Sequence, residues 1–417
     1  TNSTQNEPTV AATADGGFVV IWSSANSTPA GDGSSTGVFG QRYDSNGSTV
    51  GVEFQVNTET SSTQDRADVA GLSGGGFVVS WDSANSSTAG DGSSTGVIAQ
   101  VFDAAGIATG GEIIVNTETS GAQDENAIAA LADGGFIIVW TSATSGTAGD
   151  GSSAGVFAQR FDATGTEVGG EVLVNSETSG RQEFADVAGL VGGGYVITWE
   201  SDGQDGSADG VFARQFAADG IPVAQEFRVN DSRGSSQQDP KVTALDTGGY
   251  AITWEDNSGR DGSGTGIFVQ QYDAFGNRID SETQVNTEFS STQDQPVISS
   301  LQGGGFVVAW ASNTSVTAGD GSGDGGFYQI YGNAPPVVTD MTADGFEDTP
   351  LVLDNTLFEA GFNDGDGQAL ALIRIEVLPS QGQLLLAGMP VIAGDEVSLQ
   401  ELIDGDLTYI GGMDFFG

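Results

Sequence analysis

Apolar and polar positions follow one pattern that is repeated six times along most of the chain. In each copy a Gly-rich turn and an apolar run lead to a tryptophan, a polar loop follows, and a second apolar run comes next. The copies are marked by the six tryptophans of the chain: Trp22, Trp81, Trp140, Trp199, Trp254 and Trp310. Their spacings are 59, 59, 59, 55 and 56 residues, which indicates a tandem repeat.

Each repeat contains four short runs with the alternation of β-strands and no helical periodicity. In residues 77–81 the side chains of Phe77, Val79 and Trp81 share one face of a strand, while Val78 lies on the other. A small sheet that is apolar on both faces has to stack against copies of itself. Four strands in each unit favour a propeller blade over a solenoid coil. We therefore predict an all-β fold with a six-bladed β-propeller over residues 1–332.

The sixth repeat differs from the other five at its end. The others finish with a third apolar run that ends in Val-Asn, as at Val56-Asn57, whereas the sixth passes from Tyr331 to Asn333 without one. An unpaired sheet edge invites association with another strand. We therefore expect the ring to be closed by residues before Thr1, or by a strand from a neighbouring molecule.

The overall charge limits the partners of the protein. The chain has 57 acidic and 11 basic residues, a net charge of −46, and it contains neither Cys nor His. A polyanion needs clustered Lys or Arg, so we expect no nucleic-acid partner. No apolar stretch approaches the ~18 residues of a membrane helix, so we expect no membrane insertion. Disulfides, common zinc sites and a Ser-His-Asp triad are excluded. Self-repulsion of this size requires screening by salt or by Ca²⁺.

Asp-Gly-Ser loops follow the tryptophans at equivalent places in the repeats. Carboxylates separated by Gly suit Ca²⁺, which takes six to eight oxygen ligands from a bent loop. The same residues also suit an Asx-turn, in which Asp bonds its own backbone. The candidate metal ligands in these loops are Asp32, Asp91, Asp150, Asp202, Asp205, Asp209, Asp261 and Asp320. Ca²⁺ is favoured most in the fourth repeat, which has three of these residues, Asp202, Asp205 and Asp209.

A second motif, Gln followed by an acid, precedes the first strand of the repeats. The first strand is the innermost one in a propeller, so these residues would surround the mouth of a central channel. The candidates are Asn6, Asp65, Asp124, Glu183, Asp239 and Asp294. They could bind a cation or a polyhydroxyl ligand, or they could cap loops and bond neighbouring blades. The tryptophans could be sugar-stacking platforms, but their place in apolar runs favours burial between blades.

The composition changes at Asn333-Ala334-Pro335-Pro336, and short β-runs follow over residues 350–353, 371–377, 383–386 and 407–410. Asp364 and Asp366 lie in an Asp-Gly turn between these runs and are further Ca²⁺ candidates. With Glu347-Asp348-Thr349-Pro350, this stretch resembles the cadherin-like, immunoglobulin-type repeats of large secreted bacterial surface proteins (RTX-adhesin-like). The Gly-Gly-Phe-Val-Val-x-Trp repeats are similar to those of the same class. The resemblance implies a β-sandwich over residues 333–417, bound Ca²⁺ and an extracellular place on the bacterial surface.

These observations lead to three hypotheses of function. The first is a non-enzymatic module for calcium-dependent adhesion or matrix binding, with a surface glycan, a protein or neighbouring copies as partners. The second is a subunit of an extracellular filament or surface layer assembled by β-strand complementation. The third is a carbohydrate-active enzyme that uses paired carboxylates. The third has the least support because the acids repeat symmetrically, whereas catalysis needs one asymmetric pair.

Overall fold

The structure is a computed structural model that describes residues 4–25, 35–60, 62–84, 94–143, 151, 153–206, 208–262, 264–287, 292–313, 324–332, 337–339, 341–343, 349–363, 370 and 372–411. It divides into two compact units, Thr1–Tyr331 and Gly332–Gly417, and each is described on its own. In the described part of the chain, no helix is long and apolar enough to cross a membrane.

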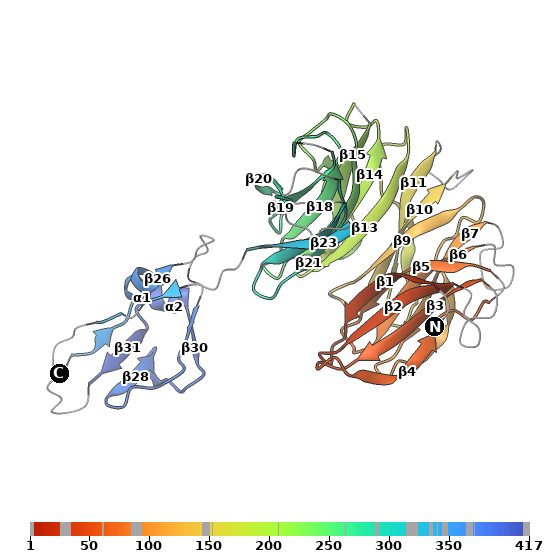
Figure 1. Ribbon diagram of the computed structural model, residues 1–417. Helices are drawn as coiled ribbons and strands as arrows, with labels where there is room; N and C mark the ends of the chain where they lie inside the picture. Colours follow the sequence, from red (N-terminus) through yellow and green to blue (C-terminus); the bar gives the residue numbers. More distant parts are fainter. Residues whose placement is uncertain are drawn as a thin grey trace. The chain divides into compact units, whose positions relative to one another are not determined.

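The described residues of the first unit form six antiparallel sheets in chain order (Figure 1). The first sheet contains β1 (Gln5–Ala12), β2 (Phe18–Ala25), β3 (Thr36–Tyr43) and β4 (Thr49–Gln55). The second contains β5 (Gln64–Gly71), β6 (Phe77–Ala84), β7 (Thr95–Phe102) and β8 (Ala108–Ile114). The third contains β9 (Gln123–Ala130), β10 (Phe136–Ala143), β11 (Ala154–Phe161) and β12 (Glu167–Leu173).

The remaining three sheets continue the pattern. The fourth contains β13 (Gln182–Leu190), β14 (Gly194–Asp202), β15 (Asp209–Phe216) and β16 (Phe227–Arg228). The fifth contains β17 (Gln237–Ala244), β18 (Tyr250–Asp256), β19 (Gly266–Tyr272) and β20 (Arg278–Gln284). The sixth contains β21 (Gln293–Ser300), β22 (Phe306–Asn313) and β23 (Asp324–Tyr331). The first unit is therefore all-β and propeller-like, and its sheets are antiparallel meanders, as the alternation predicted.

Glycine is required in the turn between the first two strands of a sheet. In the second sheet Gly75 has a φ of +96°, a conformation that side chains disfavour. A Cβ on Gly76 would lie 2.2 Å from the carbonyl oxygen of Phe102 on the third strand. The Gly-Gly pair before each apolar run therefore allows the hairpin to turn and the third strand to approach.

The tryptophans belong to the interfaces between sheets. The face of the second sheet that carries Trp81 and Val79 packs against Val19 and Ile21 of the first sheet. The same arrangement joins each of the next four sheets to the one before it. As a result, Trp81, Trp140, Trp199 and Trp254 are at most 1% exposed. Burial between sheets is thus the role of these tryptophans, although the indole N–H groups of Trp199 and Trp254 are buried without a hydrogen-bond partner.

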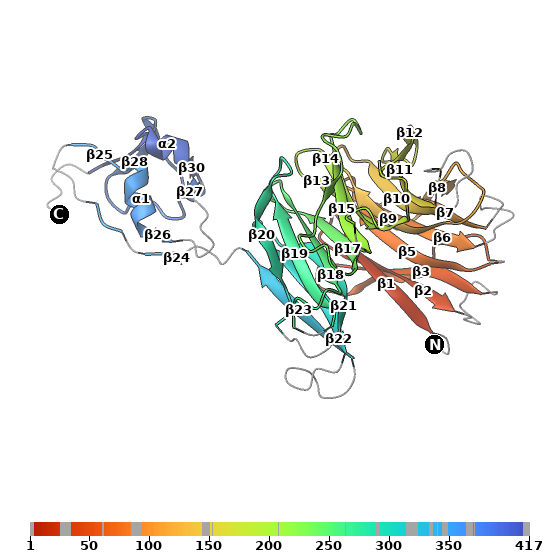
Figure 2. The ribbon, with the colours of Figure 1, turned by 90° about the horizontal axis from the view of Figure 1, so that it is seen from above.

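The first strand of each sheet is the innermost. Strands β1, β5, β9, β13, β17 and β21 pack against one another in that order, and Figure 2 shows them gathered near the centre with β8, β12 and β20 at the periphery. Each sheet repeats the same strand order, so these strands all begin at one end of the stack. We refer to the first three residues of the six inner strands, together with the second-strand residues that follow the tryptophans and pair with them, as the mouth.

The first and sixth sheets each keep one uncovered face. None of the core clusters in the described residues joins the sixth sheet to the first. Trp22 of the first sheet is only partly buried. On the sixth sheet, Tyr328 and Ile330 of β23 are 69% and 54% exposed. At the five junctions between consecutive sheets, the equivalent faces are buried.

The second unit contains small sheets and two short helices around one apolar core. Its elements are β24 (Val337–Val338), β25 (Leu351–Val352), α1 (Asn355–Gly361), β26 (Phe362–Asn363), β27 (Leu372–Arg374), β28 (Gln383–Leu386), β29 (Met389–Pro390), β30 (Glu396–Ser398), α2 (Leu399–Ile403) and β31 (Leu407–Ile410). Strands β25, β31, β28 and β29 form one sheet, while β24 pairs with β26 and β27 with β30. Val397, Leu402 and Leu407 are fully buried in the core.

The two helices were not predicted from the sequence, which was interpreted there as strands only. Each helix begins at a residue whose side chain caps it. The Asp354 carboxylate accepts from the Leu357 N–H at 3.2 Å. Ser398 and Glu401 form a reciprocal capping box at the start of α2. The Ser-x-x-Glu spacing is a signal that could have identified α2.

Candidate functional site

Two recurring motifs of the sequence meet just beneath the mouth. The Asn of each Val-Asn pair accepts a hydrogen bond from a third-strand N–H, as Asn175 does from Val156 at 2.8 Å. Its amide nitrogen donates to the buried Gln that opens the next inner strand, as Asn175 does to Gln182 at 3.2 Å. The same bonds occur at Asn57, Asn116, Asn230 and Asn286. The recurring Gln therefore links consecutive repeats, and it holds the residues that follow it at the mouth.

Each inner strand has a β-bulge near its start, so that two of its residues face one tryptophan of the second strand. In the second sheet the pairing passes from Asp65–Asp82 to Asp68–Ser80, which leaves Arg66 and Ala67 opposite Trp81. The first bulge residue has a positive φ between 47° and 57° in all six sheets. These bulge residues are Glu7, Arg66, Glu125, Phe184, Asp239 and Gln295.

The bulge corrects the predicted alignment of the fifth repeat. The sequence analysis placed Asp239 with Asp65, Asp124 and Glu183. In the structure Gln237 pairs with Asp256 and Gln238 with Glu255, so Gln238 is the residue equivalent to Asp65. Asp239 is the bulge residue, with a φ of +48°. The error arose because the fifth repeat has two successive glutamines, and only strand pairing shows which one is the buried Gln.

The bulge N–H groups are capped by acids from the preceding sheet. Arg66 donates to Glu7 at 3.0 Å, and Phe184 donates to Glu125 at 3.2 Å. In the other three cases the acceptor is the residue just after the tryptophan of the preceding sheet. Glu125 donates to Asp82 at 3.0 Å, Asp239 to Glu200 at 3.3 Å and Gln295 to Glu255 at 2.6 Å. Acids at the mouth thus join neighbouring sheets, but none of these five acceptors is among the residues for which the sequence suggested capping.

Burial keeps two of these capping carboxyl groups, those of Asp82 and Glu200, neutral. Asp82 and Glu200 are 2% and 3% exposed. Desolvation raises the pKa of Asp82 to about 8, against hydrogen bonds from Asn126 and Glu125. Desolvation, with the charges of Asp209 and Asp239, raises the pKa of Glu200 to about 9. At neutral pH both groups hold a proton in the folded protein.

The fifth sheet breaks the sixfold pattern, because it has an acid both at the bulge and after the tryptophan. Burial raises the pKa of Glu255 to about 7, and the charges of Asp239 and Asp294 and a hydrogen bond with the Asp239 carboxyl add to this effect. A neighbouring negative charge and a hydrogen bond to the neutral acid both favour the protonated form of Glu255. The Asp239–Glu255 pair is therefore a proton-holding group at the mouth. No other sheet has acids at both positions.

The other predicted mouth residues are the second residues of their inner strands. Asp65, Asp124 and Glu183 are partly buried at the start of β5, β9 and β13, and burial raises the pKa of each. Glu183 also forms an ion pair with Arg181 at 2.7 Å. Asn6 and Asp294 hold the equivalent positions in β1 and β21. The mouth is thus lined with carboxyl groups, two from each of the second to fifth sheets.

Most of the predicted calcium ligands lie outside the described residues. These are Asp32, Asp91, Asp150, Asp320, Asp364 and Asp366. Among the others, Asp209 accepts from the Gln238 amide at 3.3 Å, and buried Asp261 accepts from Asn286 at 3.4 Å. Asp202 is exposed, and the Asp205 carboxyl lies against Gly210. Within the described ranges, no three acidic side chains come close enough together to hold a metal ion.

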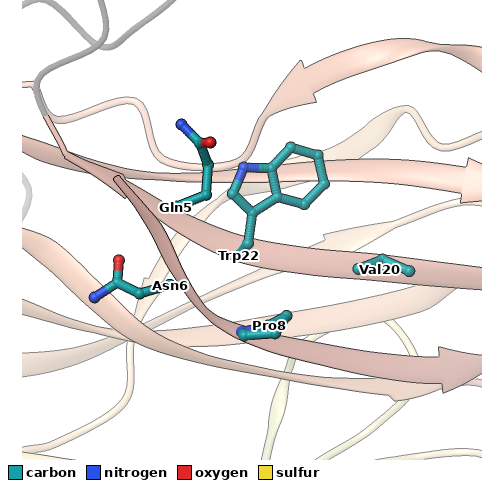
Figure 3. A pocket seen from close by; sticks show the side chains of 5 residues that line it. All are labelled: Gln5, Asn6, Pro8, Val20 and Trp22. Atoms are coloured by element: carbon teal, nitrogen blue, oxygen red, sulfur yellow. The ribbon is translucent and has the colours of Figure 1, made fainter. Parts of the chain in front are cut away.

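A hollow of about 210 Å³ lies on the uncovered face of the first sheet. Figure 3 shows its lining, with the Trp22 ring beside Gln5 and with Asn6, Pro8 and Val20 around it. None of these side chains is charged. The corresponding residues of the second sheet, Val79 and Trp81, are buried against the sheet before it. The hollow therefore lies on a face that the second sheet buries against its neighbour. The acidic residues lie elsewhere, at the mouth.

Sequence reasoning named Asp239 but not its place at the bulge, and it missed four other acids of the mouth, Asp82, Glu125, Glu200 and Glu255. Two signals could have found them. One is the position after each tryptophan, which is occupied in turn by Ser23, Asp82, Thr141, Glu200, Glu255 and Ala311. The other is the second residue after each buried Gln, where the bulge falls. Comparing these two positions across the repeats singles out the fifth.

Comparisons with known proteins support the fold. Neither a scan against protein-family models nor a search of curated proteins finds a match. The chain is similar to an α-L-arabinofuranosidase from Fusarium graminearum solved with an iminosugar inhibitor, with a TM-score of 0.52 and 12% identity over 79% of this chain and 94% of that one. A structure of that organism's α-L-arabinofuranosidase with arabinobiose gives a TM-score of 0.50 and 13% identity over 78% and 91%.

A protein of unknown function from Dyadobacter fermentans is similar to the same extent, with a TM-score of 0.51 and 12% identity over 79% of this chain and 95% of that one. At these identities the likeness shows the fold alone. It is the fold of a class of β-propellers that includes glycoside hydrolases.

These comparisons correct the expected function. The sequence analysis favoured a non-enzymatic adhesion module, with a filament subunit as the alternative, and placed an enzyme last. That prediction is contradicted, because the structures of established function that share this arrangement of sheets are arabinofuranosidases and not adhesion modules. The symmetry expected from the repeats is broken in one sheet. The acids repeat along the sequence, but the Asp239–Glu255 pair occurs in one sheet only.

Proposed function

We propose that the first unit is a six-bladed β-propeller that binds a polysaccharide at the mouth and hydrolyses a glycosidic bond there. Glu255 is the proton donor, and Asp239 keeps it protonated. Asp294, whose negative charge reaches Glu255, is the second carboxylate.

The observation that carries this proposal is the Asp239–Glu255 pair. Glycoside hydrolysis needs one carboxyl group that holds a proton near neutral pH and another that is ionised. A pKa of about 7 lets Glu255 donate its proton and take it back at the operating pH. The pair lies at the mouth, where inner strands from several sheets supply further polar groups. The arabinofuranosidases that share the fold support a glycoside as the kind of substrate.

In the proposed reaction Glu255 transfers its proton to the glycosidic oxygen as the bond to the anomeric carbon breaks. The leaving sugar departs as an alcohol. A water molecule adds to the anomeric carbon, directly or after a glycosyl ester forms with Asp294, and its proton returns to a carboxylate. Electron-rich groups around the mouth stabilise the positive charge that develops on the sugar ring.

The experiment is a hydrolysis assay of the full chain on 4-nitrophenyl α-L-arabinofuranoside, linear arabinan, xylan and mixed-linkage β-glucan. We expect release of nitrophenol or reducing ends from at least one of them. Glu255→Gln should lower the rate by about 10²–10⁴-fold, the usual contribution of general acid catalysis. It keeps the shape of the side chain and removes the transferable proton.

Asp82→Asn is the matched control. Asp82 occupies the position of Glu255 in the second sheet and caps the next bulge in the same way, but its neighbour at the bulge is Arg66. We expect its rate to stay within a few-fold of the parent protein. Absence of hydrolysis on the whole panel, or equal rates for the parent and Glu255→Gln, would overturn the proposal.

Three expectations from the sequence remain proposals beside this one. The second unit, residues 333–417, is proposed to be a cadherin-like β-sandwich repeat. Ca²⁺ is proposed to bind the Asp-Gly-Ser loops. Secretion to the bacterial surface is proposed from the resemblance of both units to large secreted surface proteins, and it would bring the mouth into contact with extracellular polysaccharide.

A further inference from the structure

One of the six bulge positions holds an apolar residue, whereas the other five hold polar residues. Five bulge residues are polar, namely Glu7, Arg66, Glu125, Asp239 and Gln295, and the sixth is Phe184 in the fourth sheet. The bulge itself does not require an aromatic side chain, because the other sheets form it without one. Phe184 therefore calls for an explanation that is specific to the fourth sheet.

The conformation of Phe184 costs energy that packing does not recover. Its φ is +54°, a left-handed conformation that is a genuine outlier for a bulky side chain. The side chain is 37% exposed. It belongs to none of the apolar clusters and none of the ring contacts found among the described residues. All six bulge residues share this φ, so the feature particular to the fourth sheet is an exposed aromatic residue at the strained position.

The surroundings of Phe184 are those of a ligand site. Its N–H donates to the Glu125 carboxylate at 3.2 Å, and the neighbouring Glu183 pairs across the sheet with Glu200. Glu200 in turn caps Asp239, so Phe184 lies one sheet away from the Asp239–Glu255 pair. An exposed aromatic residue thus occupies a position whose backbone is bonded to one carboxyl group and whose neighbour in the strand pairs with another. That combination matches a sugar ring, which has an apolar face and a rim of hydroxyl donors.

The charge of the mouth selects among sugars. Asp65, Asp124, Glu125, Glu183 and Asp239 gather there, and the chain carries a net charge of −46. A negative field of this kind repels uronic acids, sulfated sugars and other anionic ligands. The fitting substrate is therefore an uncharged polysaccharide.

We propose that Phe184 is a stacking platform that holds a neutral sugar unit beside the Asp239–Glu255 pair. This inference rests on the proposed function and names the substrate class of the same site. Phe184 touches the bound sugar chain but takes no part in proton transfer.

The test measures affinity in the Glu255→Gln background, where ligand is bound but not consumed. Isothermal titration or affinity electrophoresis would use neutral oligosaccharides of arabinan and xylan, with oligogalacturonate as the anionic probe. We expect Phe184→Ala to weaken binding of the neutral ligand about tenfold and Phe184→Tyr to keep it within about threefold, because Tyr retains the ring. Oligogalacturonate should bind more weakly than either neutral ligand.

Phe275→Ala is the matched control. Phe275 is an 83% exposed phenylalanine in the tight turn between β19 and β20, away from the inner strands. We expect it to leave affinity unchanged. Phe184→Gly tests whether Phe184 has only a structural role, because it measures melting temperature and binding together. Gly adopts a positive φ without strain, so this variant should melt at a higher temperature while it binds more weakly.

Unchanged affinity in Phe184→Ala, or tighter binding of oligogalacturonate than of neutral sugars, would overturn the inference. So would a lower melting temperature for Phe184→Gly. The result is separable from the proposed function. Loss of hydrolysis in Glu255→Gln with normal binding by Phe184→Ala removes the platform only. Phe184-dependent binding by a protein that hydrolyses no substrate removes the enzymatic proposal and keeps the platform.

Discussion

The backbone N–H of Asp239 donates a hydrogen bond of 3.3 Å to the carboxyl group of Glu200, across the junction of the fourth and fifth sheets. This one bond links a strained bulge residue to a buried acid, and it connects two sheets that have to stack. Asp239 also raises the pKa of Glu200 and of Glu255 by its charge. The chemistry of the mouth is therefore coupled to the packing of the propeller.

The first prediction concerns stability and pH. The pKa of Glu200 is about 9 in the folded protein against 4.5 when it is exposed, so the folded state holds the proton more tightly. The contribution of Glu200 to stability is full below pH 4.5 and is lost as the pH rises toward 9. The loss is on the order of a few kcal/mol. Thermal unfolding from pH 5 to 9 should show a flatter dependence for Glu200→Gln than for the parent, with the variant more stable at pH 9.

Glu53→Gln is the control for this comparison, because Glu53 is exposed on β4. Its curve should run parallel to that of the parent. Parallel curves for Glu200→Gln as well would mean that Glu200 does not hold a proton in the folded state.

A second prediction concerns the pH dependence of hydrolysis. Glu255 has to be protonated to donate, so kcat/KM should fall as the pH rises through about 7. The negative charge of Asp239 raises the pKa of Glu255, so Asp239→Asn should lower that pKa and move the basic limb to a lower pH. Rates on the most active substrate from pH 4 to 9 would measure the shift. A basic limb at the same pH in Asp239→Asn and in the parent protein would exclude Asp239 as the partner of Glu255.

A third prediction tests the Asn–Gln link between consecutive repeats. Asn175→Ala removes the acceptor of the Val156 N–H and the donor to Gln182, and both groups are buried. An unsatisfied buried group costs about 1–3 kcal/mol. Denaturant unfolding should show a loss of this size in the free energy of unfolding. Asn46→Ala in an exposed turn should change it by less than about 0.5 kcal/mol.

A fourth prediction concerns the uncovered face of the first sheet. Trp22 is partly buried, whereas Trp140 is 1% exposed. Acrylamide should therefore quench part of the tryptophan fluorescence, and Trp22→Phe should remove most of that part. Trp140→Phe should leave the quenching intact and should cost more stability, because its indole fills the junction of the second and third sheets. Equal quenching in the parent and Trp22→Phe would show that this face is covered in solution.

The fifth prediction concerns calcium, which stays a prediction from the sequence. If the Asp-Gly-Ser loops bind Ca²⁺, about 5 mM of it should raise the melting temperature above the value with chelator. The same concentration of Mg²⁺ would show how much of the rise in melting temperature comes from charge screening alone. A double change of Asp205 and Asp209 to Asn should reduce the difference if the fourth repeat holds an ion. Equal melting temperatures in Ca²⁺ and in chelator would remove the calcium claim.

The sequence by itself determined the repeat, the strands and the way the sheets stack. Alternation along 77–81 shows two apolar faces, and a sheet with two apolar faces needs a neighbour on each side. Tryptophan burial follows from the same pattern, as Trp81 and Trp199 show. These features depend on residues a few positions apart, so a linear pattern contains them.

Only the tertiary structure decided which acids meet. The bulge moved Asp239 by one place from its expected position, and strand pairing then brought it to Glu255, sixteen residues along the chain. The helix α2 and the exposed ring of Phe184 likewise depend on local geometry that alternation does not encode. The pKa of a carboxyl group depends on its burial and on charges from other sheets. Those are distances in space, and the spacing of residues along the chain does not specify them.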